Sequence, residues 1–129
     1  MPVYGYIYKI TNTKTNHTYI GQTTTLLKLR YRLDIIRGWI KERKERTNQK
    51  FIEELNEEDL ELTEILDVAF CQYHLDKLEV YYINKFNCCD NGYNTHPGNH
   101  KSKDGIEEFN QILLKHNLEF IDGELRRIV

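Results

Sequence analysis

Tyrosine occupies every second position near the start of the chain, at Tyr4, Tyr6 and Tyr8. Aromatic and β-branched residues alternate in this way in β-strands, because successive side chains point to opposite faces of a sheet. Residues 4–10 and 18–22 are therefore predicted to form two strands, and the polar run at residues 11–17 is predicted to join them as a hairpin. The three tyrosines should share one face of the sheet.

Whether Tyr8 and Tyr19 share that face depends on the register of the hairpin. In an antiparallel pair, the positions of opposed residues have a constant sum. An odd sum, which an even-length loop such as residues 13–16 produces, places both phenols on one face. We predict this register.

The later segments alternate between helical and strand patterns. Apolar residues recur at spacings of three and four in residues 26–40, 48–55, 72–86 and 106–115, which predicts amphipathic helices. Residues 60–69 alternate as a third strand does, and Asp122-Gly123 predicts a second hairpin. Gly92 is expected to take a positive φ after the helix at 72–86. The pattern predicts an α/β (α+β layered) fold, a small antiparallel three-stranded sheet flanked by helices.

Composition restricts the class of protein. The chain has 129 residues, 40% of them hydrophobic and 29% charged, which is typical of one globular domain. No segment has the roughly 18 consecutive apolar residues of a membrane span. The three cysteines are an odd number and two are adjacent, so we expect reduced thiols and a cytoplasmic protein.

Charge is distributed unevenly along the chain. The net charge of −2 argues against a protein that coats nucleic acid. Residues 28–50, however, carry nine basic side chains against three acids, and residues 53–67 carry eight acids and no lysine or arginine. The basic block is either a solvated helix face or a surface that binds phosphates. Its candidate DNA contacts are Arg32, Arg37, Lys41, Arg43 and Lys44.

Glu79 interrupts the apolar stripe of the predicted helix at residues 72–86. It lies four residues after Leu75 and three before Tyr82, both of which are apolar stripe positions. A carboxylate avoids such a place unless it is paired, protonated or bound to a cation. Glu79 is therefore either a hydrogen-bonded structural residue or a metal ligand.

Several of these segments together resemble the GIY-YIG nucleases. The first signature of that family corresponds to Tyr6-Ile7-Tyr8, and the second stands intact as Tyr19-Ile20-Gly21. Residues 78–83 resemble the segment around the family's metal-binding glutamate, and Gly92-Tyr93-Asn94 matches a downstream Gly-Tyr-Asn. The resemblance runs from about residue 4 to residue 94. It implies a nuclease domain over residues 1–97, with residues 98–129 as a helix and short hairpin packed on it.

The resemblance assigns roles to five residues. Tyr8 would be the base or its relay, and Tyr19 would orient water or phosphate. Arg30 would neutralise charge on the phosphate, Glu79 would bind one Mg²⁺ or Mn²⁺, and Asn94 would hold an oxygen by hydrogen bonds. A single hard oxygen ligand suits Mg²⁺, which keeps several waters and takes further ligands from phosphate.

Three further residues are candidates for supporting this site. A phenol with an ordinary pKa near 10 is a weak base at neutral pH, so it needs a nearby cation or acceptor, and His17 and Asp34 are such acceptors. Tyr6 lies in the first signature. Asp34 stands where the family often has a histidine, four residues after Arg30, and an aspartate can pair with that arginine as a structural contact.

The sequence thus supports two main hypotheses of function. The first is a metal-dependent DNA endonuclease with a single-metal site, similar to homing-type and phage nucleases and suited to a mobile element. The second is a catalytically degenerate domain that binds DNA or a protein without cutting, which Asp34 and the acidic net charge favour. A structural module is a third reading. A single metal site cuts one strand, so double-strand cleavage would require a homodimer or sequential nicking.

Overall fold

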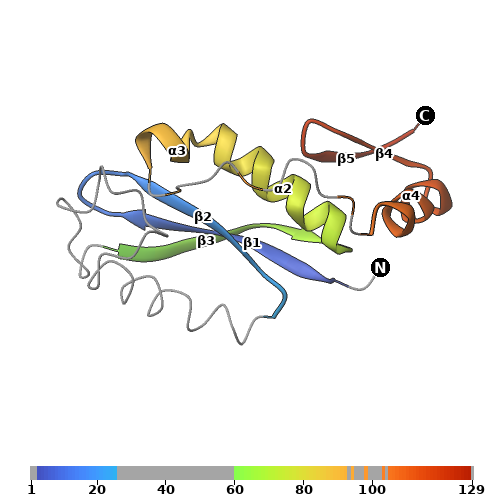
Figure 1. Cartoon of the computed structure of the whole chain (residues 1–129), viewed down its shortest axis with the longest axis horizontal. Coiled ribbons are helices and arrows are strands. Elements are labelled where there is room, and N and C mark those ends of the chain that lie inside the picture. The colour runs from blue at the N-terminus through green and yellow to red at the C-terminus, as the bar shows by residue number, and fades with distance from the viewer. Residues whose placement is uncertain are drawn as a thin grey trace.

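A three-stranded antiparallel sheet, in the order β2-β1-β3, forms the centre of the molecule (Figure 1). The computed structural model describes residues 3–25, 60–92, 94, 98, 103 and 105–128, with the main chain alone at residues 60–64, 90 and 91. The strands are β1 (Gly5–Asn12), β2 (Thr18–Thr23) and β3 (Leu60–Ala69). Helix α2 (Gln72–Lys85) lies along one face of the sheet. The predicted fold class, the third strand and the helix that follows it are confirmed.

The register of β1 and β2 is the predicted one. Tyr8 lies opposite Gly21, and Ile10 lies opposite Tyr19. Because the sum of opposed positions is odd, Tyr8 and Tyr19 share a face. That face is the one turned away from α2, since the neighbouring Ile7 and Ile20 pack under the helix.

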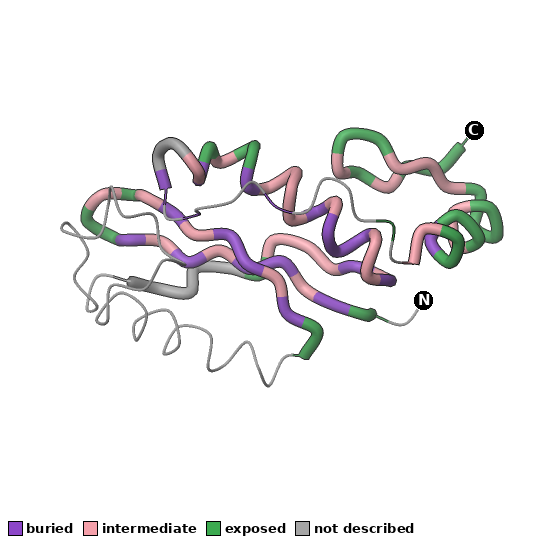
Figure 2. The backbone as a smooth tube through the Cα atoms, in the orientation of Figure 1, coloured by how far each residue is buried: buried purple, intermediate pink, exposed green. Residues whose placement is uncertain are grey.

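The hydrophobic core lies between the sheet and α2 (Figure 2). Leu75 and Leu78 of the helix are fully buried, and Ile83 is nearly so, as the apolar stripe predicts. Tyr82 and Phe86 are partly buried and pack against the same cluster. Burying an aliphatic side chain of this size contributes about 2 kcal/mol relative to leaving it exposed, so this interface fixes the position of α2 on the sheet.

The expectation for Gly92 is wrong. Its φ is −148°, an extended conformation, and a short helix α3 (Cys88–Asn91) that the sequence did not indicate precedes it. The reason for glycine here is close approach. A Cβ atom at this position would stand 2.5 Å from the Thr18 carbonyl oxygen and 2.7 Å from the Cys88 Cα atom.

The C-terminal segment packs against α2. It consists of α4 (Ile106–Lys115), β4 (Leu118–Ile121) and β5 (Glu124–Arg127). Asp122 and Gly123 have φ values of 51° and 78°, as a type I′ hairpin turn requires, so the predicted hairpin is confirmed. The division of the chain near residue 97 stays a prediction.

His74 of α2 joins the C-terminal segment to the sheet layer. Its ring stacks on Phe109 with centroids 4.7 Å apart and meets Phe120 edge-on at 5.2 Å. Its Nδ1 accepts a hydrogen bond of 3.1 Å from the Phe70 amide. Burial lowers the pKa of the imidazole to about 4, and the nearby Asp67 charge opposes this shift.

This buried histidine should make the fold sensitive to acid. The unfolded chain binds a proton at His74 below pH 6.5, whereas the folded protein resists it down to about pH 4, so the histidine's stabilising contribution is lost as pH falls between these values. The loss should reach about 3 kcal/mol. We expect NMR titration of the ring protons to give a midpoint near 4, and the stability advantage of wild type over His74→Gln should shrink from pH 7 to pH 4. A midpoint near 6.5 would contradict the prediction.

Other sequence predictions have mixed outcomes. Cys71, Cys88 and Cys89 are free thiols, as expected. Within the described part of the chain, no helix is both long and apolar enough to cross a bilayer. The helices predicted at residues 26–40 and 48–55, and the basic block at 28–50, lie outside the described residues.

Candidate active site

The two signature segments meet at Tyr8 and Gly21. Tyr8 is almost fully buried, and its phenol lies directly over the Gly21 main chain. A Cβ atom on Gly21 would overlap the Tyr8 hydroxyl and ring, so the second signature needs glycine to admit the tyrosine of the first. The Tyr19 ring lies 6.5 Å from the Tyr8 ring, centroid to centroid. The two predicted catalytic phenols are therefore neighbours on one face.

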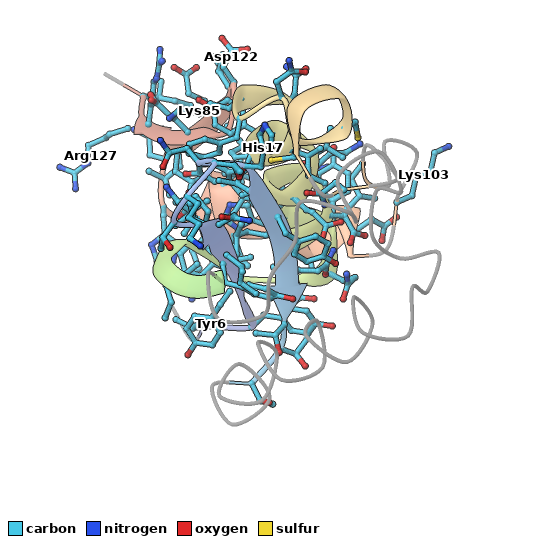
Figure 3. The ribbon with its side chains drawn as sticks, turned by 90° about the vertical axis from the view of Figure 1, so that its left-hand side faces the viewer. Tyr6, His17, Lys85, Lys103, Asp122 and Arg127 are labelled. Carbon is cyan, nitrogen blue, oxygen red and sulfur yellow. The ribbon has the colours of Figure 1, made fainter. Side chains whose placement is uncertain are left out.

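Tyr6 and His17 lie at opposite ends of this hairpin. Tyr6 is opposite Thr23, far from the turn, and Figure 3 shows it on the side of the sheet away from α2. His17 lies in the turn, where its carbonyl accepts a 2.9 Å hydrogen bond from the Asn12 amide. Tyr8 lies between them along the strand.

Asn94 binds the free edge of β2 through its whole side-chain amide. Its Oδ1 accepts a hydrogen bond of 3.0 Å from the Ile20 N–H, and its Nδ2 donates one of 2.9 Å to the Ile20 carbonyl. These are the two main-chain groups that β1 leaves unpaired on the residue between Tyr19 and Gly21. Asn94 thus fixes the position of the strand that carries the second signature.

Removing this amide should destabilise the fold. Asn94 is 6% exposed, so Asn94→Ala leaves two buried main-chain groups of Ile20 without their partner. We expect a loss of about 2–3 kcal/mol in the free energy of unfolding, measured by urea denaturation. Asn110→Ala, at an exposed position of α4, is the matched control and should change stability by less than about 0.5 kcal/mol. Equal effects of the two substitutions would contradict the role of Asn94.

Glu79 lies on the flank of α2 that faces the edge strand β2. It is partly buried, and burial raises the pKa of its carboxyl to about 7, with the nearby Asp76 charge acting in the same direction. A side-chain hydrogen bond from Gln22 of β2 favours the ionised form and offsets part of this shift. None of these three influences, which come from the described residues, supplies a positive charge. A hard divalent cation would supply one and prefers carboxylate oxygen, so the residue fits a metal ligand.

Gln22 and Asp76 are the residues that sequence analysis missed. Gln22 directly follows the second signature, and Asp76 lies one helical turn before Glu79. Two acidic residues at i and i+3 lie on the same side of a helix, and this spacing was the sequence signal that could have identified Asp76. In the described part of the chain, no three His, Cys, Asp or Glu side chains gather as a metal site.

Four of the predicted site residues lie around β2, but on different sides of it. Tyr8 and Tyr19 share the face turned away from α2, Asn94 binds the edge of the strand, and Glu79 lies on the α2 side, where Gln22 is its neighbour. The remaining candidates are outside the described residues: Arg30, Asp34, Arg32, Arg37, Lys41, Arg43 and Lys44.

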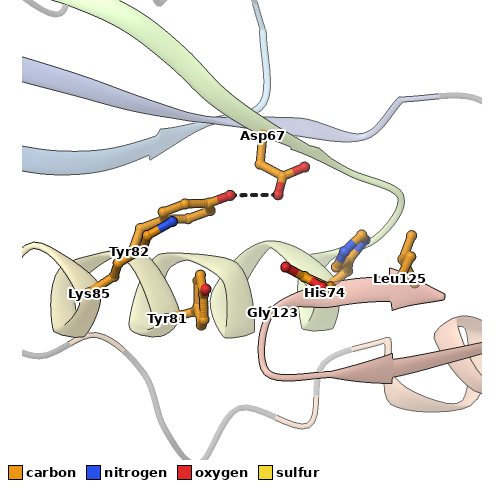
Figure 4. Close-up of a pocket in the computed structure, with 8 residues that line it drawn as sticks. Asp67, His74, Tyr81, Tyr82, Lys85, Gly123 and Leu125 are labelled. Carbon is orange, nitrogen blue, oxygen red and sulfur yellow. Dashed lines mark hydrogen bonds between the residues drawn. The ribbon is translucent and has the colours of Figure 1, made fainter.

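A separate cavity of about 360 Å³ opens on the other flank of α2, toward β3 and the C-terminal hairpin (Figure 4). The Tyr82 hydroxyl crosses it to donate a 2.9 Å hydrogen bond to Asp67. Lys85 lies over the Tyr81 and Tyr82 rings. None of the predicted site residues lines this cavity.

Comparison with known proteins finds a similar structure. The catalytic domain of the intron endonuclease I-TevI, in a mutant with one glutamate replaced by alanine, matches with a TM-score of 0.58 and 20% sequence identity. The match covers 74% of this chain and 96% of that domain. No family model matches the chain, and no curated protein matches it. The chain therefore has the fold of this catalytic domain.

Proposed function

We propose that the chain is a metal-dependent DNA endonuclease of the GIY-YIG type, which hydrolyses phosphodiester bonds at a single-metal site. The observation that carries this proposal is that β2 presents Tyr19 beside Tyr8 on one face and, three residues later, Gln22 toward Glu79 on the α2 side. The edge strand β2 thus has a pair of phenols on one face and a partly buried carboxylate beside its other face. The fold shared with an endonuclease catalytic domain supports the same conclusion.

The proposed mechanism gives each of five residues one role. Tyr8 takes a proton from the attacking water either as a phenolate or as a relay that passes its own proton to an adjacent acceptor, while Tyr19 orients that water or the phosphate. Arg30 neutralises charge on the phosphate. Glu79 would hold Mg²⁺ or Mn²⁺, which supplies positive charge for the leaving oxygen when bound. Asn94 positions β2 through the Ile20 main chain.

A plasmid cleavage assay tests this proposal. Supercoiled DNA at low salt is incubated with the protein and Mg²⁺, or with the protein and a chelator. We expect conversion only with metal, because in the proposed mechanism the metal held by Glu79 supplies the positive charge that the transition state needs. Nicked product appearing before linear product would indicate one site per molecule, and linear product appearing directly would indicate a homodimer.

The alternative is a binding module that does not cut. Asp34, where the family often has a histidine, and the net charge of −2 are the features that favour it. The alternative would be supported if the protein slows the migration of DNA in a gel-shift assay but cleaves no supercoiled, linear or branched substrate. In that case Asp34→His is the next variant to assay, since a histidine can give or take a proton near neutral pH.

A further inference from the structure

Gln22 is the contact between the signature strand and the helix that carries Glu79. It lies opposite Ile7 in the register, so its side chain points to the α2 face of the sheet. Its Nε2 donates a 3.1 Å hydrogen bond to Asp76 Oδ1, and its Oε1 accepts one of 3.3 Å from Gln72 Nε2. Gln22 is also close enough to Glu79 to favour the ionised form of its carboxyl, which lowers the pKa against the effect of burial. Because its oxygen is used by an amide donor, its NH₂ group must face the two carboxylates.

Asp76 fixes this orientation. Asp76 as a residue is 6% exposed, and its Oδ1 accepts hydrogen bonds from Gln22 and, at 2.7 Å, from Gln72. Asp76 and Glu79 are one turn apart on one flank of α2, so they repel each other when both are ionised. The two glutamine amides hold Asp76 in place despite this cost.

We propose that Gln22 and Asp76 are positioning residues that hold the Glu79 carboxylate against β2 for divalent-metal binding. The inference rests on the proposed function, because it takes Glu79 as the metal ligand. Gln22 orients the carboxylate by a hydrogen bond, and Asp76 fixes Gln22 and adds negative charge near the cation. Partners of metal ligands typically change metal affinity by about 10–100-fold when they are replaced.

The proposal is tested by measuring the affinity of the full chain for Mn²⁺ in the absence of DNA. Electron paramagnetic resonance is used to detect the bound metal. Gln22→Met keeps the length of the side chain and removes the amide. We expect it to weaken Mn²⁺ binding by about 10–100-fold. Asp76→Asn keeps an acceptor oxygen and removes the charge, and it should weaken binding by about tenfold. Gln111→Met, at an exposed position of α4, is the matched control and should bind as wild type does.

Cleavage kinetics give the second measurement. If the two residues only position Glu79, Gln22→Met should need about 10–100-fold more Mn²⁺ for half-maximal cleavage, while its rate at saturating Mn²⁺ returns to within about threefold of wild type. A general structural defect would instead lower the saturating rate and the melting temperature without this shift. Wild-type Mn²⁺ affinity in folded Gln22→Met and Asp76→Asn would overturn the proposal.

The two proposals can fail separately. Wild type that binds Mn²⁺ but cuts no DNA, with both variants binding more weakly, would overturn the endonuclease and support the positioning pair. If wild type cuts DNA with metal and both variants keep the wild-type Mn²⁺ affinity, the endonuclease is supported and the positioning pair is overturned. Should Gln22→Met fail to fold by circular dichroism, Asp76→Asn decides the outcome.

Discussion

Replacing Glu79 with glutamine is expected to reduce plasmid cleavage by at least about 10³-fold while leaving the protein folded. The substitution keeps the shape of the side chain and removes the charge that would anchor the metal. Metal stabilisation of developing charge is worth several kcal/mol, and each 1.4 kcal/mol is a factor of ten in rate. The fold should persist, because burial already favours the neutral form of this side chain and raises its pKa to about 7.

The comparison needs a matched carboxylate elsewhere on the molecule. Glu107→Gln removes one negative charge from an exposed position in the first turn of α4 and should cleave at the wild-type rate. Initial rates at several Mg²⁺ concentrations, together with circular dichroism and melting curves, separate loss of metal binding from loss of fold. A folded Glu79→Gln protein with wild-type, metal-dependent cleavage would remove Glu79 from the mechanism.

Adding one methyl group at Gly21 should have the largest effect on stability. In Gly21→Ala the new Cβ atom would overlap the Tyr8 phenol, which is buried. Overpacking of this kind costs about 3 kcal/mol, so we expect a clear fall in the urea midpoint. Cleavage should fall as well, because relief of the clash would displace Tyr8 from its place beside Tyr19.

A double-mutant cycle can show that the clash is with Tyr8 itself. Tyr8→Leu alone destabilises the fold by removing a buried ring. On that background Gly21→Ala should cost far less than it does in wild type, because the leucine lacks the outer ring atoms and hydroxyl that the methyl group meets. An equal cost of Gly21→Ala on both backgrounds would place the strain elsewhere.

The elements of this fold follow from local patterns. Alternation at Tyr6 and Tyr8 specified a strand, and the polar loop of even length specified the register that places Tyr19 on the same face. The spacing of Leu75, Leu78 and Tyr82 by three and four residues specified the buried side of α2. These patterns succeed because side-chain periodicity within one segment decides which face is buried.

Other features required the assembled structure. Gly92 was expected to need a positive φ, but it is extended and needs to be small because Thr18 and Cys88 approach it. Asn94 matched a signature, yet only the structure shows that its amide pairs with the Ile20 main chain.

The sequence by itself determined the strands, their register, the helix α2 and the candidate residues Tyr8, Tyr19 and Glu79. Tertiary structure alone decided that Gln22 meets Asp76 across 54 positions of sequence and that the same amide reaches Glu79. The physical reason is that periodicity within one segment sets the face on which a side chain lies. Its hydrogen-bond partner, in contrast, depends on where a distant element packs. Here the docking of α2 on the sheet supplied that partner.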